Sequence, residues 1–327
     1  MIYLETGSTD PYFNLAFEEY VFEKMDPTKS YFILWQNENT IVVGRHQNTY
    51  EEINQRYVEE HGIRVVRRLS GGGAVYHDKG NLNYTFIVDK DAAPDFNFAV
   101  FTLPVIKTLE QLGVKAEFTG RNDLTIDGKK FCGNAQYVRR GRILHHGCIM
   151  LDSNLDVVVN ALKVREAKFQ SKGVKSVRSR VTTINAHAPR PITMEEFKSL
   201  LKSYIFEAEG LEPMDLTPEQ LAEVRRLRDE KYATWEWNYG ASPAYDMRLE
   251  ERFDFGLVTV YLQAERGRIK GVKIYGDFFG SGELSELEAA LVGLPLDDNL
   301  EKSLEPLDVG RYIHGMTARD LARLLRG

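Results

Sequence analysis

A glycine-rich segment between two apolar runs carries the strongest chemical signal in the sequence, Arg67-Arg68-Leu69-Ser70-Gly71-Gly72-Gly73-Ala74-Val75-Tyr76-His77-Asp78. Three consecutive glycines let the backbone approach a ligand closely and turn N–H groups toward it, and the two arginines add positive charge. The segment suits a phosphate or an adenylate, with a glycine-rich surface hairpin as the alternative. It is neither a P-loop nor a dinucleotide fingerprint, because it lacks G-x-x-x-x-G-K-[ST] and a strand-like run follows where the fingerprint requires a helix.

A second cluster surrounds the pair Asp127-Gly128. This pair predicts a two-residue hairpin, since a type I′ turn needs positive φ at both central positions. The return strand then directs Lys129 and Lys130 to opposite faces, so that one lysine can enter a pocket while the other meets water. A solvated strand edge is the alternative. The small and amide residues on both arms favour a lined site: Asn122, Asp123, Gly133, Asn134, Ala135 and Gln136.

Two further segments carry titratable groups. His145 and His146 are adjacent on a predicted strand and therefore point to opposite faces, which disfavours a shared metal; no Cys-x-x-Cys or His-x-x-x-His spacing supports a zinc site. The stretch from Lys172 to Arg180 holds four cations among Gly and Ser residues. It is typical of either a solvated basic loop or a phosphate-binding patch.

The elements that must position these groups follow an α/β pattern. Asp10-Pro11 begins a helix, because proline is favoured at the first helical position. Trp235 and Trp237 alternate, which predicts a packed strand. A new unit begins near Met247. The other predicted strands are 31–35, 40–43, 63–66, 74–77, 82–88, 257–263 and 270–275, and the other predicted helices are 98–112, 194–209, 218–230, 283–292 and 317–325.

Composition narrows the class of protein. The chain has 327 residues, 43% of them hydrophobic, with net charge −6 and a pI of about 5.8. Its length predicts one large core and an accessory domain, and its acidic balance argues against non-specific nucleic-acid binding. Two cysteines provide no disulfide framework and predict the reducing cytoplasm. No signal-peptide pattern or run of 18 apolar residues is present, which argues against secretion and against a membrane span.

Taken together, these segments resemble the lipoate–protein ligase family over nearly all of the first 245 residues, and more weakly beyond. The matching stretches are Leu34 to Asn37, Val43 to Asn48, Arg68 to Asp78, Gly120 to Leu124, Lys130, His145 to Gly147 and Ser176 to Val181. The resemblance implies an α/β fold of the α+β type. It places a large biotin/lipoate-ligase-like catalytic domain with a mixed or antiparallel sheet over residues 1–245, and a small C-terminal α/β accessory domain, a cap, over residues 246–327.

The resemblance also implies a reaction and a set of site residues. The family activates lipoic acid with ATP and Mg²⁺ to lipoyl-adenylate, and then passes the lipoyl group to a lysine of an acceptor protein. Lys130 matches the catalytic lysine of the family, and Asp123 matches the implied Mg²⁺ ligand. The implied adenylate-binding residues are Arg68, Ser70, Gly71, Gly72, Gly73, Ala74, Val75, Tyr76, Asn122, Asp123 and Lys130. The implied lipoyl-binding residues are Trp35, Arg68, His77, Lys130 and His146.

The implied partners are lipoyl-acceptor domains, in 2-oxoacid dehydrogenase acyltransferase subunits and the glycine-cleavage H protein, with no nucleic acid, no membrane and a monomeric chain. An ATP-independent lipoyl or octanoyl transferase is the nearest alternative, but neither place where such enzymes carry a nucleophilic cysteine has one here. The two cysteines present, Cys132 and Cys148, are expected to be small buried strand residues. A non-catalytic lipoate-binding protein is the other alternative, although it would be expected to lose the glycine loop or Lys130.

Overall fold

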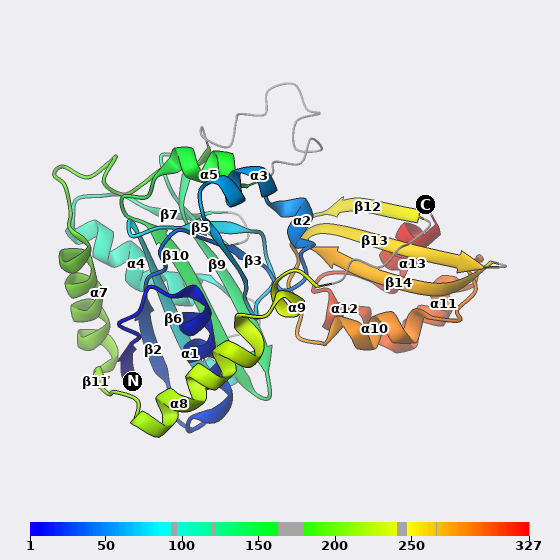
Figure 1. The fold of residues 1–327 in the computed structure, drawn as a ribbon, viewed down its shortest axis with the longest axis horizontal. Helices are drawn as coiled ribbons and strands as arrows, with labels where there is room; N and C mark the ends of the chain where they lie inside the picture. Colours follow the sequence, from blue (N-terminus) through cyan, green and yellow to red (C-terminus); the bar gives the residue numbers. More distant parts are fainter. Residues whose placement is uncertain (93–96, 120–121, 163–179, 241–246, 266, 327) are drawn as a thin grey trace.

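The computed structural model describes residues 1–92, 97–119, 122–162, 180–240, 247–265 and 267–326. Figure 1 shows a larger part, which holds the N-terminus, and a smaller part formed by the chain from Met247 onward. The predicted division at residue 245 falls among residues 241–246, outside the described residues. The basic stretch from Lys172 to Arg180 also lies outside them, except for Arg180 itself.

The larger part is built on a mixed eight-stranded sheet. Its parallel edge comes from the N-terminal strand and its neighbours, while the other strands pair antiparallel. In spatial order the strands are β11 (Glu212–Pro213), β1 (Ile2–Glu5), β2 (Tyr31–Trp35), β6 (Asn81–Asp89), β10 (Arg142–Met150), β9 (Lys129–Arg139), β8 (Asp123–Ile126) and β7 (Glu117–Thr119).

Helices cover both faces of this sheet. Alternate strand residues point to opposite sides, and in β2 both sets are apolar and buried, so each face packs against helices. Phe32 and Leu34 of β2 pack with α4 (Ala99–Gln111) and α7 (Met194–Glu209), whereas Tyr31 and Ile33 pack with α1 (Pro11–Lys24) and α8 (Pro218–Leu227). The predicted start of α1 is confirmed: the Asp10 side chain accepts a hydrogen bond from the Tyr12 N–H, and Pro11 is the first helical residue.

A smaller sheet holds the glycine-rich segment. Its order is β4 (Arg64–Arg67), β3 (Thr40–Val43) and β5 (Val75–His77), so the segment connects its two outer strands. Apolar residues of this sheet pack with α3 (Gln55–Glu60) and α5 (Leu155–Ala161), and the short α2 (Thr49–Glu52) precedes α3. The glycine loop is thus anchored at both ends on buried strands.

The chain from Met247 onward has a core of its own. A three-stranded antiparallel sheet, with Val260 and Ile274 on its buried face, packs against helices that carry Leu287 and Leu321. The elements are β12 (Met247–Phe253), β13 (Gly256–Glu265), β14 (Arg268–Gly276), α10 (Leu284–Leu291), α11 (Leu300–Leu304), α12 (Val309–Tyr312) and α13 (Ala318–Arg326), with a 3-10 turn at Glu305–Leu307. The strands and helices predicted here are confirmed to within a few residues.

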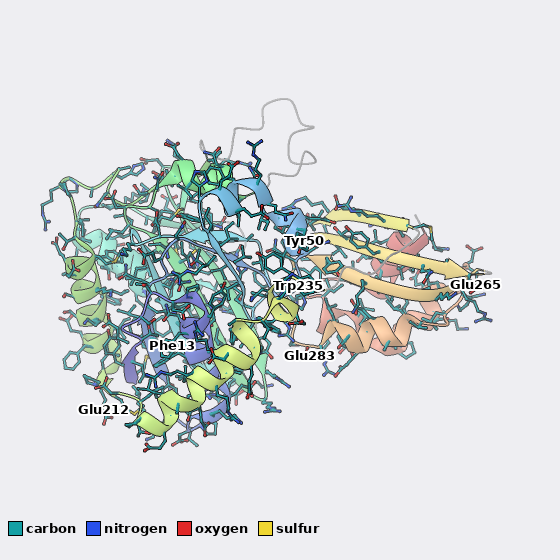
Figure 2. All side chains as sticks on the ribbon, in the orientation of Figure 1. Phe13, Tyr50, Glu212, Trp235, Glu265 and Glu283 are labelled. Carbon is teal, nitrogen blue, oxygen red and sulfur yellow. The ribbon has the colours of Figure 1, made fainter. Side chains whose placement is uncertain are left out.

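One predicted strand is wrong. Trp235 and Trp237 lie in a single helical turn, α9 (Trp235–Asn238), because the Thr234 side chain caps it by accepting from the Trp237 N–H. A π-helical turn, Arg228–Tyr232, also extends the chain beyond the predicted helix 218–230. Figure 2 shows Tyr50, Trp235 and Glu283 at the junction of the two parts. In the described part of the chain no helix has the length and apolar character needed to cross a membrane.

Candidate active site

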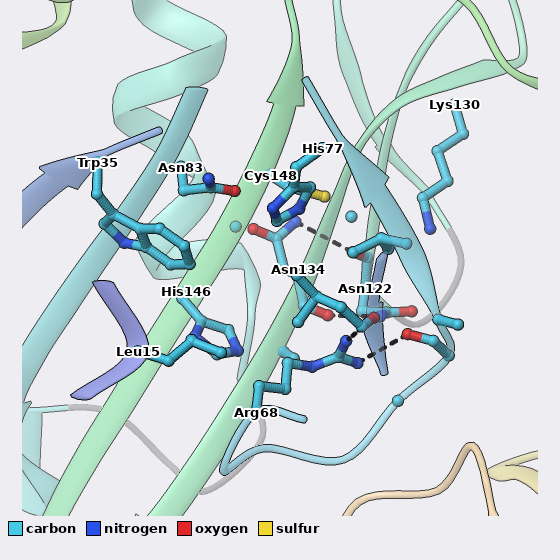
Figure 3. A pocket seen from close by; sticks show the side chains of 18 residues that line it. Leu15, Trp35, Arg68, His77, Asn83, Asn122, Lys130, Asn134, His146 and Cys148 are labelled. Carbon is cyan, nitrogen blue, oxygen red and sulfur yellow. Dashed lines mark hydrogen bonds between the residues drawn. The ribbon is translucent and has the colours of Figure 1, made fainter. Parts of the chain in front are cut away.

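Two adjoining cavities contain most of the predicted site residues. We call them the inner cavity, of about 90 Å³, and the outer cavity, of about 550 Å³. Both are lined by Lys130 and by the end of the glycine-rich segment. Among the predicted residues, the inner cavity is lined by Trp35, Arg68, Gly72, Gly73, Ala74, Val75, His77, Asn122, Lys130 and His146 (Figure 3). The outer cavity is lined by Gly73, Ala74, Val75, Tyr76, Asp123 and Lys130, while Ser70 and Gly71 line neither.

The predicted hairpin brings Lys130 to this boundary. Asp127 and Gly128 have φ of 50° and 71°, as a type I′ turn requires, and Ile126 pairs with Lys129 across it. Lys129 is exposed, whereas Lys130 points inward with its side chain 33% exposed. The two lysines therefore lie on opposite faces of the hairpin.

Local contacts fix the Lys130 ammonium. Its Nζ lies 2.7 Å from Oδ1 of Asp123. Burial alone would lower the pKa of Lys130, but the Asp123 carboxylate and the nearby thiols raise it, so the lysine is a cation at neutral pH. A Cβ atom at Gly133 would stand 2.8 Å from Nζ, so this glycine leaves the space that the ammonium occupies.

His146 belongs to a buried chain of hydrogen bonds that no sequence motif indicates. Its Nδ1 lies 2.9 Å from Oε1 of Glu18, a residue of α1 that is 1% exposed. Because a carboxylate only accepts, Nδ1 carries the hydrogen, and in the neutral ring Nε2 accepts from the Ser70 hydroxyl at 2.5 Å. Glu18 also accepts from the Thr85 hydroxyl at 2.6 Å. Glu18 and His146 are 128 residues apart, and no local pattern marks them as partners.

Ser70 continues this chain into the glycine loop. Its hydroxyl accepts from Nε of Arg68 at 3.0 Å, and Nη2 of Arg68 donates to the carbonyls of Gly71 and Gly73 at 2.7 and 2.8 Å. Burial lowers the pKa of Arg68 to about 10, which leaves it charged at neutral pH. Ser70 and Arg68 therefore stabilise the conformation of the glycine loop through these buried hydrogen bonds.

Arg67 differs from the expectation that both arginines flank a ligand. It lines neither cavity, and its guanidinium donates to the carbonyls of Gly44 and Gln47 and to the Thr49 hydroxyl. These hydrogen bonds from Arg67 hold in place the segment that connects β3 to α2. Strand alternation explains the difference, since consecutive residues at the end of β4 point to opposite sides.

The two histidines lie on opposite faces, as predicted. His145 is fully buried against Phe98 and Phe101 and lies 3.1 Å from the Gln136 amide, and burial holds its pKa well below the ordinary value. Among the described residues, no group of three or more His, Cys, Asp or Glu side chains could hold a metal ion. In the outer cavity the carboxylates come from Asp123, Glu52 and Asp277, and of these only Asp123 lies beside Lys130.

The polar residues of the hairpin divide between the cavity and the sheet interior. Asn122 and Asn134 line the inner cavity and bond each other through side-chain amides and backbone carbonyls at 2.5 and 3.0 Å. Tyr84 donates to the Asn134 side chain at 2.5 Å. Gln136 lines neither cavity, and its amide lies 3.1 Å from Nδ1 of the buried His145. The expectation of a site lined by amides therefore holds for part of the hairpin.

Both cysteines are free, and their thiols are not activated. Cys132 is fully buried in the core, as expected, whereas Cys148 is only partly buried and lines both cavities. Burial raises the pKa of each thiol, despite the opposing effect of the nearby Lys130 ammonium. A thiol with a raised pKa is a poor nucleophile at neutral pH.

The C-terminal part closes one side of the outer cavity. Arg252, Leu257, Gly276 and Asp277 line it, together with Arg180 from the larger part. No motif marked the four C-terminal residues, because they reach the cavity only through the packing of two separate cores. Arg180, in contrast, ends the basic stretch that the sequence indicated as a possible phosphate-binding patch.

The glycine loop itself is a contact between the two parts. Gly72 N donates to the carbonyl of Phe278 at 3.2 Å, and a side chain at Gly71 would overlap that same carbonyl. Gly276 N donates to the carbonyl of His46 at 2.7 Å, and Arg45 pairs with Glu283 at 2.5 Å. Gly71 therefore serves a close backbone approach, but toward the C-terminal part.

Comparisons with known proteins agree with this architecture. Residues 10–206 match the lipoyl protein ligase A/B catalytic domain, and residues 242–325 match the bacterial lipoate protein ligase C-terminus. The chain is 46% identical to lipoate–protein ligase 1 of Staphylococcus aureus over 97% of both chains.

Solved structures show the same likeness. The bipartite lipoate protein ligase of Thermoplasma acidophilum, studied with its E2 lipoyl domain, is 28% identical with a TM-score of 0.65, and the match covers 75% of this chain and 98% of that one. A lipoate-protein ligase A bound with ATP is 26% identical with a TM-score of 0.61, covering 73% and 97%. On the strength of both family matches and the identity over nearly its whole length, this chain belongs to the lipoate–protein ligase family.

Proposed function

We propose that the protein activates lipoate with ATP and then transfers the lipoyl group to a lysine of a lipoyl-acceptor domain. The observation that carries this proposal is the position of the Lys130 ammonium on the boundary shared by the inner and outer cavities. An acyl acid in the inner cavity and a nucleotide in the outer cavity would meet at this cation. Related proteins support both ligands, since one related ligase is bound with ATP and a structural relative from Thermoplasma acidophilum is bound with lipoic acid.

The two half-reactions make different demands on Lys130. In the first, a carboxylate oxygen of lipoate attacks the α-phosphorus of ATP, and the bond to pyrophosphate breaks. In the second, the acceptor amine attacks the acyl carbonyl, AMP leaves, and the amine loses a proton. Negative charge grows on phosphate oxygens in the first step and on the carbonyl oxygen in the second, and a fixed ammonium stabilises both.

The other site residues have supporting roles in this proposal. The adenylate contacts Gly73 to Tyr76 and Asp123 in the outer cavity and Arg68, Gly72 and Asn122 in the inner cavity, while Ser70 and Gly71 hold the loop in shape. Trp35, His77 and His146 surround the acyl chain. The oxygen chemistry of Asp123 fits Mg²⁺, which commonly binds through one or two carboxylates together with substrate phosphates. When bound there, the ion would neutralise phosphate charge. We also propose the division at residue 245, a monomeric chain in the cytoplasm, and acceptors that include acyltransferase lipoyl domains and the glycine-cleavage H protein.

Lipoate-dependent exchange of labelled pyrophosphate into ATP tests the first half-reaction directly. We expect exchange with lipoate and none without an acyl acid. The absence of exchange from a protein that nevertheless lipoylates an acceptor from an acyl-carrier donor would favour the transferase alternative. Loss of both reactions would favour a lipoate-binding protein.

The cysteines provide a second test against the transferase. Cys148 lines both cavities, but its raised pKa disfavours a thiolate. We expect Cys132→Ser with Cys148→Ser to keep activity within about tenfold, since the ligase route needs no protein thioester. A lipoyl or octanoyl thioester on Cys148, detected by mass spectrometry, would contradict the ligase mechanism.

A further inference from the structure

The inner cavity has two chemically different ends. Lys130 and Asn122 lie at one end, and Trp35 lies at the other, next to Asn83, its partner across the β2–β6 pairing (Figure 3). In the proposed function the carboxylate reacts beside Lys130. The far end of an acyl chain would therefore lie near Trp35 and Asn83.

His77 presents a buried hydrogen-bond donor at this cavity. The Asn14 amide donates to Oδ1 of Asn37 at 2.9 Å, which turns the Asn37 Nδ2 toward Nδ1 of His77 at 3.2 Å. Nδ1 of His77 must then accept, so its Nε2 carries the hydrogen. Burial lowers the pKa of His77 to about 3, which keeps the ring neutral. This Nε2–H has no hydrogen-bond partner among the described residues, and the side chain is 3% exposed.

Asn83 presents a second donor of the same kind. In the structure its Oδ1 accepts from the Asn81 amide at 3.0 Å. Its Nδ2 has no partner in the described part of the chain, and Asn83 is 1% exposed. His77 and Asn83 both line the inner cavity, and the His77 ring lies 6.2 Å from that of Trp35.

Unpaired buried donors are costly, so their presence beside a cavity indicates a ligand that accepts hydrogen bonds. A saturated alkyl tail has no acceptor, whereas sulfur is a weak acceptor and highly polarisable. We propose that His77 and Asn83 form a donor pair that selects acyl acids with a sulfur-bearing far end, such as the dithiolane ring of lipoate, over straight-chain acids of similar length. This inference rests on the proposed function and adds the substrate preference.

The first test uses the unchanged protein and three acids in the pyrophosphate exchange assay: lipoate, octanoate and 5-cyclopentylpentanoate. The last has the shape of lipoate with both sulfurs replaced by methylene groups. We expect kcat/KM to be about tenfold higher for lipoate than for the cyclopentyl acid, since only lipoate can accept from the pair. Equal values for these two acids would overturn the inference.

The second test changes the donors. Asn83→Leu and His77→Phe remove one donor each at similar volume, and both are expected to reduce severalfold the ratio of kcat/KM for lipoate to kcat/KM for octanoate, whatever their effect on either value alone. Leu15→Val is the matched control, because Leu15 lines the same cavity without a polar atom and its change should affect all three acids alike. A preference left intact in both donor variants would also overturn the inference.

These outcomes separate the two proposals. Absence of exchange with every acid would contradict the proposed function. Exchange with all three acids at equal kcat/KM would leave the proposed function standing and remove the donor pair as the source of selectivity.

Discussion

At the scale of single residues, Lys130 owes its position to its neighbours as much as to its own strand. Asp123 holds the ammonium at 2.7 Å, and Gly133 supplies the space for it. Cys148 and Asn122 line the cavity beside it. A lysine with a fixed cationic head meets the requirement for stabilising charge that develops during reaction without rearrangement at that moment.

The matched pair Lys129 and Lys130 tests this position. Lys130→Ala should lower the rate of adenylation by about a hundredfold or more, since one fixed donor contributes roughly 3 kcal/mol in the transition state. Lys129→Ala removes an exposed lysine from the same hairpin and should change the rate less than twofold. Pyrophosphate exchange with both variants, together with their thermal melts, decides the matter. Similar losses in the two variants would contradict the assignment.

The orientation of a site residue could be predicted from the sequence where its neighbours along the chain determine that orientation. The turn at Asp127-Gly128 fixed the side to which Lys130 points. The partner of His146 could not be predicted in this way, because Glu18 lies on the first helix and meets it only after the sheet and α1 have packed. The donor pair of His77 and Asn83 was hidden for the same reason.

At the scale of elements, strands and helices with strong periodic patterns were predicted closely, because burial on one side dictates the pattern. The strands β2 and β3 and the helix α7 begin and end where the sequence indicated. The error at Trp235 arose in a short segment, where two alternating aromatics fit a strand and a capped helical turn equally well. There the Thr234 cap decided the outcome.

The glycine loop is an element whose role the structure changes in part. The sequence indicated a loop that approaches a ligand, whereas Gly71 and Gly72 approach the backbone at Phe278. Only the end of the loop, from Gly73 onward, lines the outer cavity. The loop therefore contacts the C-terminal part through Gly71 and Gly72 and the outer cavity through the residues from Gly73 onward.

Gly71→Ala tests this contact between elements. An added methyl group would overlap the Phe278 carbonyl, so the loop or the C-terminal part must shift. We expect adenylation to fall at least tenfold, since a small misplacement of binding groups is costly in catalysis. Transfer from supplied lipoyl-adenylate should fall less. Gly310→Ala is the control, because a Cβ there meets its nearest neighbour at an ordinary 3.5 Å. Equal adenylation rates in both variants would show that the contact does not matter.

At the scale of the whole molecule, buried neutral histidines link stability to pH. Burial lowers the pKa of His46 to about 3, and its ring stacks on Phe278 at the junction, with centroids 5.1 Å apart. Between pH 6.5 and 3 the unfolded chain binds a proton at His46 that the folded protein does not. The free energy of unfolding should therefore fall as the pH falls, by about 1.4 kcal/mol per pH unit for this group.

Denaturant titrations between pH 6 and 4.5 measure this dependence. His46→Gln should reduce the slope by about 1.4 kcal/mol per pH unit, because it removes one group that binds protons only when unfolded. His61→Gln, at an exposed position, provides the comparison. An unchanged slope in His46→Gln would mean that His46 takes up its proton without leaving the folded state.

Arg252 is the cation that the C-terminal part adds to the outer cavity, which also contains Lys130 and Arg180. The Arg252 side chain is 56% exposed, and its guanidinium comes no nearer than 3.9 Å to the Asp277 carboxylate. This ion pair is loose, so the Arg252 charge remains available to a phosphate in the cavity. Arg252→Ala should raise KM for ATP severalfold and leave lipoyl transfer from supplied adenylate unchanged. Arg323→Ala is the control, since Arg323 pairs with Glu251 outside the cavity. Loss of transfer in Arg252→Ala would place this residue in the second half-reaction instead.

Removal of the whole C-terminal part tests which of the two half-reactions depends on it. All the predicted adenylate and lipoyl residues belong to the larger part, which has its own cores, whereas the C-terminal part contributes one wall of the outer cavity. A chain that ends near Tyr245 should fold and transfer the lipoyl group from supplied lipoyl-adenylate to an acceptor domain. It should be strongly impaired in making that adenylate, because the outer cavity loses a wall, a cation and its protection from water.

Separate assays of the two half-reactions on this shortened chain complete the test. Circular dichroism and a thermal melt establish that it is folded before either assay is interpreted. Full adenylation would show that the wall formed by Arg252, Leu257, Gly276 and Asp277 is dispensable. Failure of both half-reactions in a folded chain would place essential site residues beyond residue 245, which would contradict the position of the reacting groups around Lys130. Loss of adenylation with retained transfer is the expected result, since only the first half-reaction uses the triphosphate that the outer cavity must enclose.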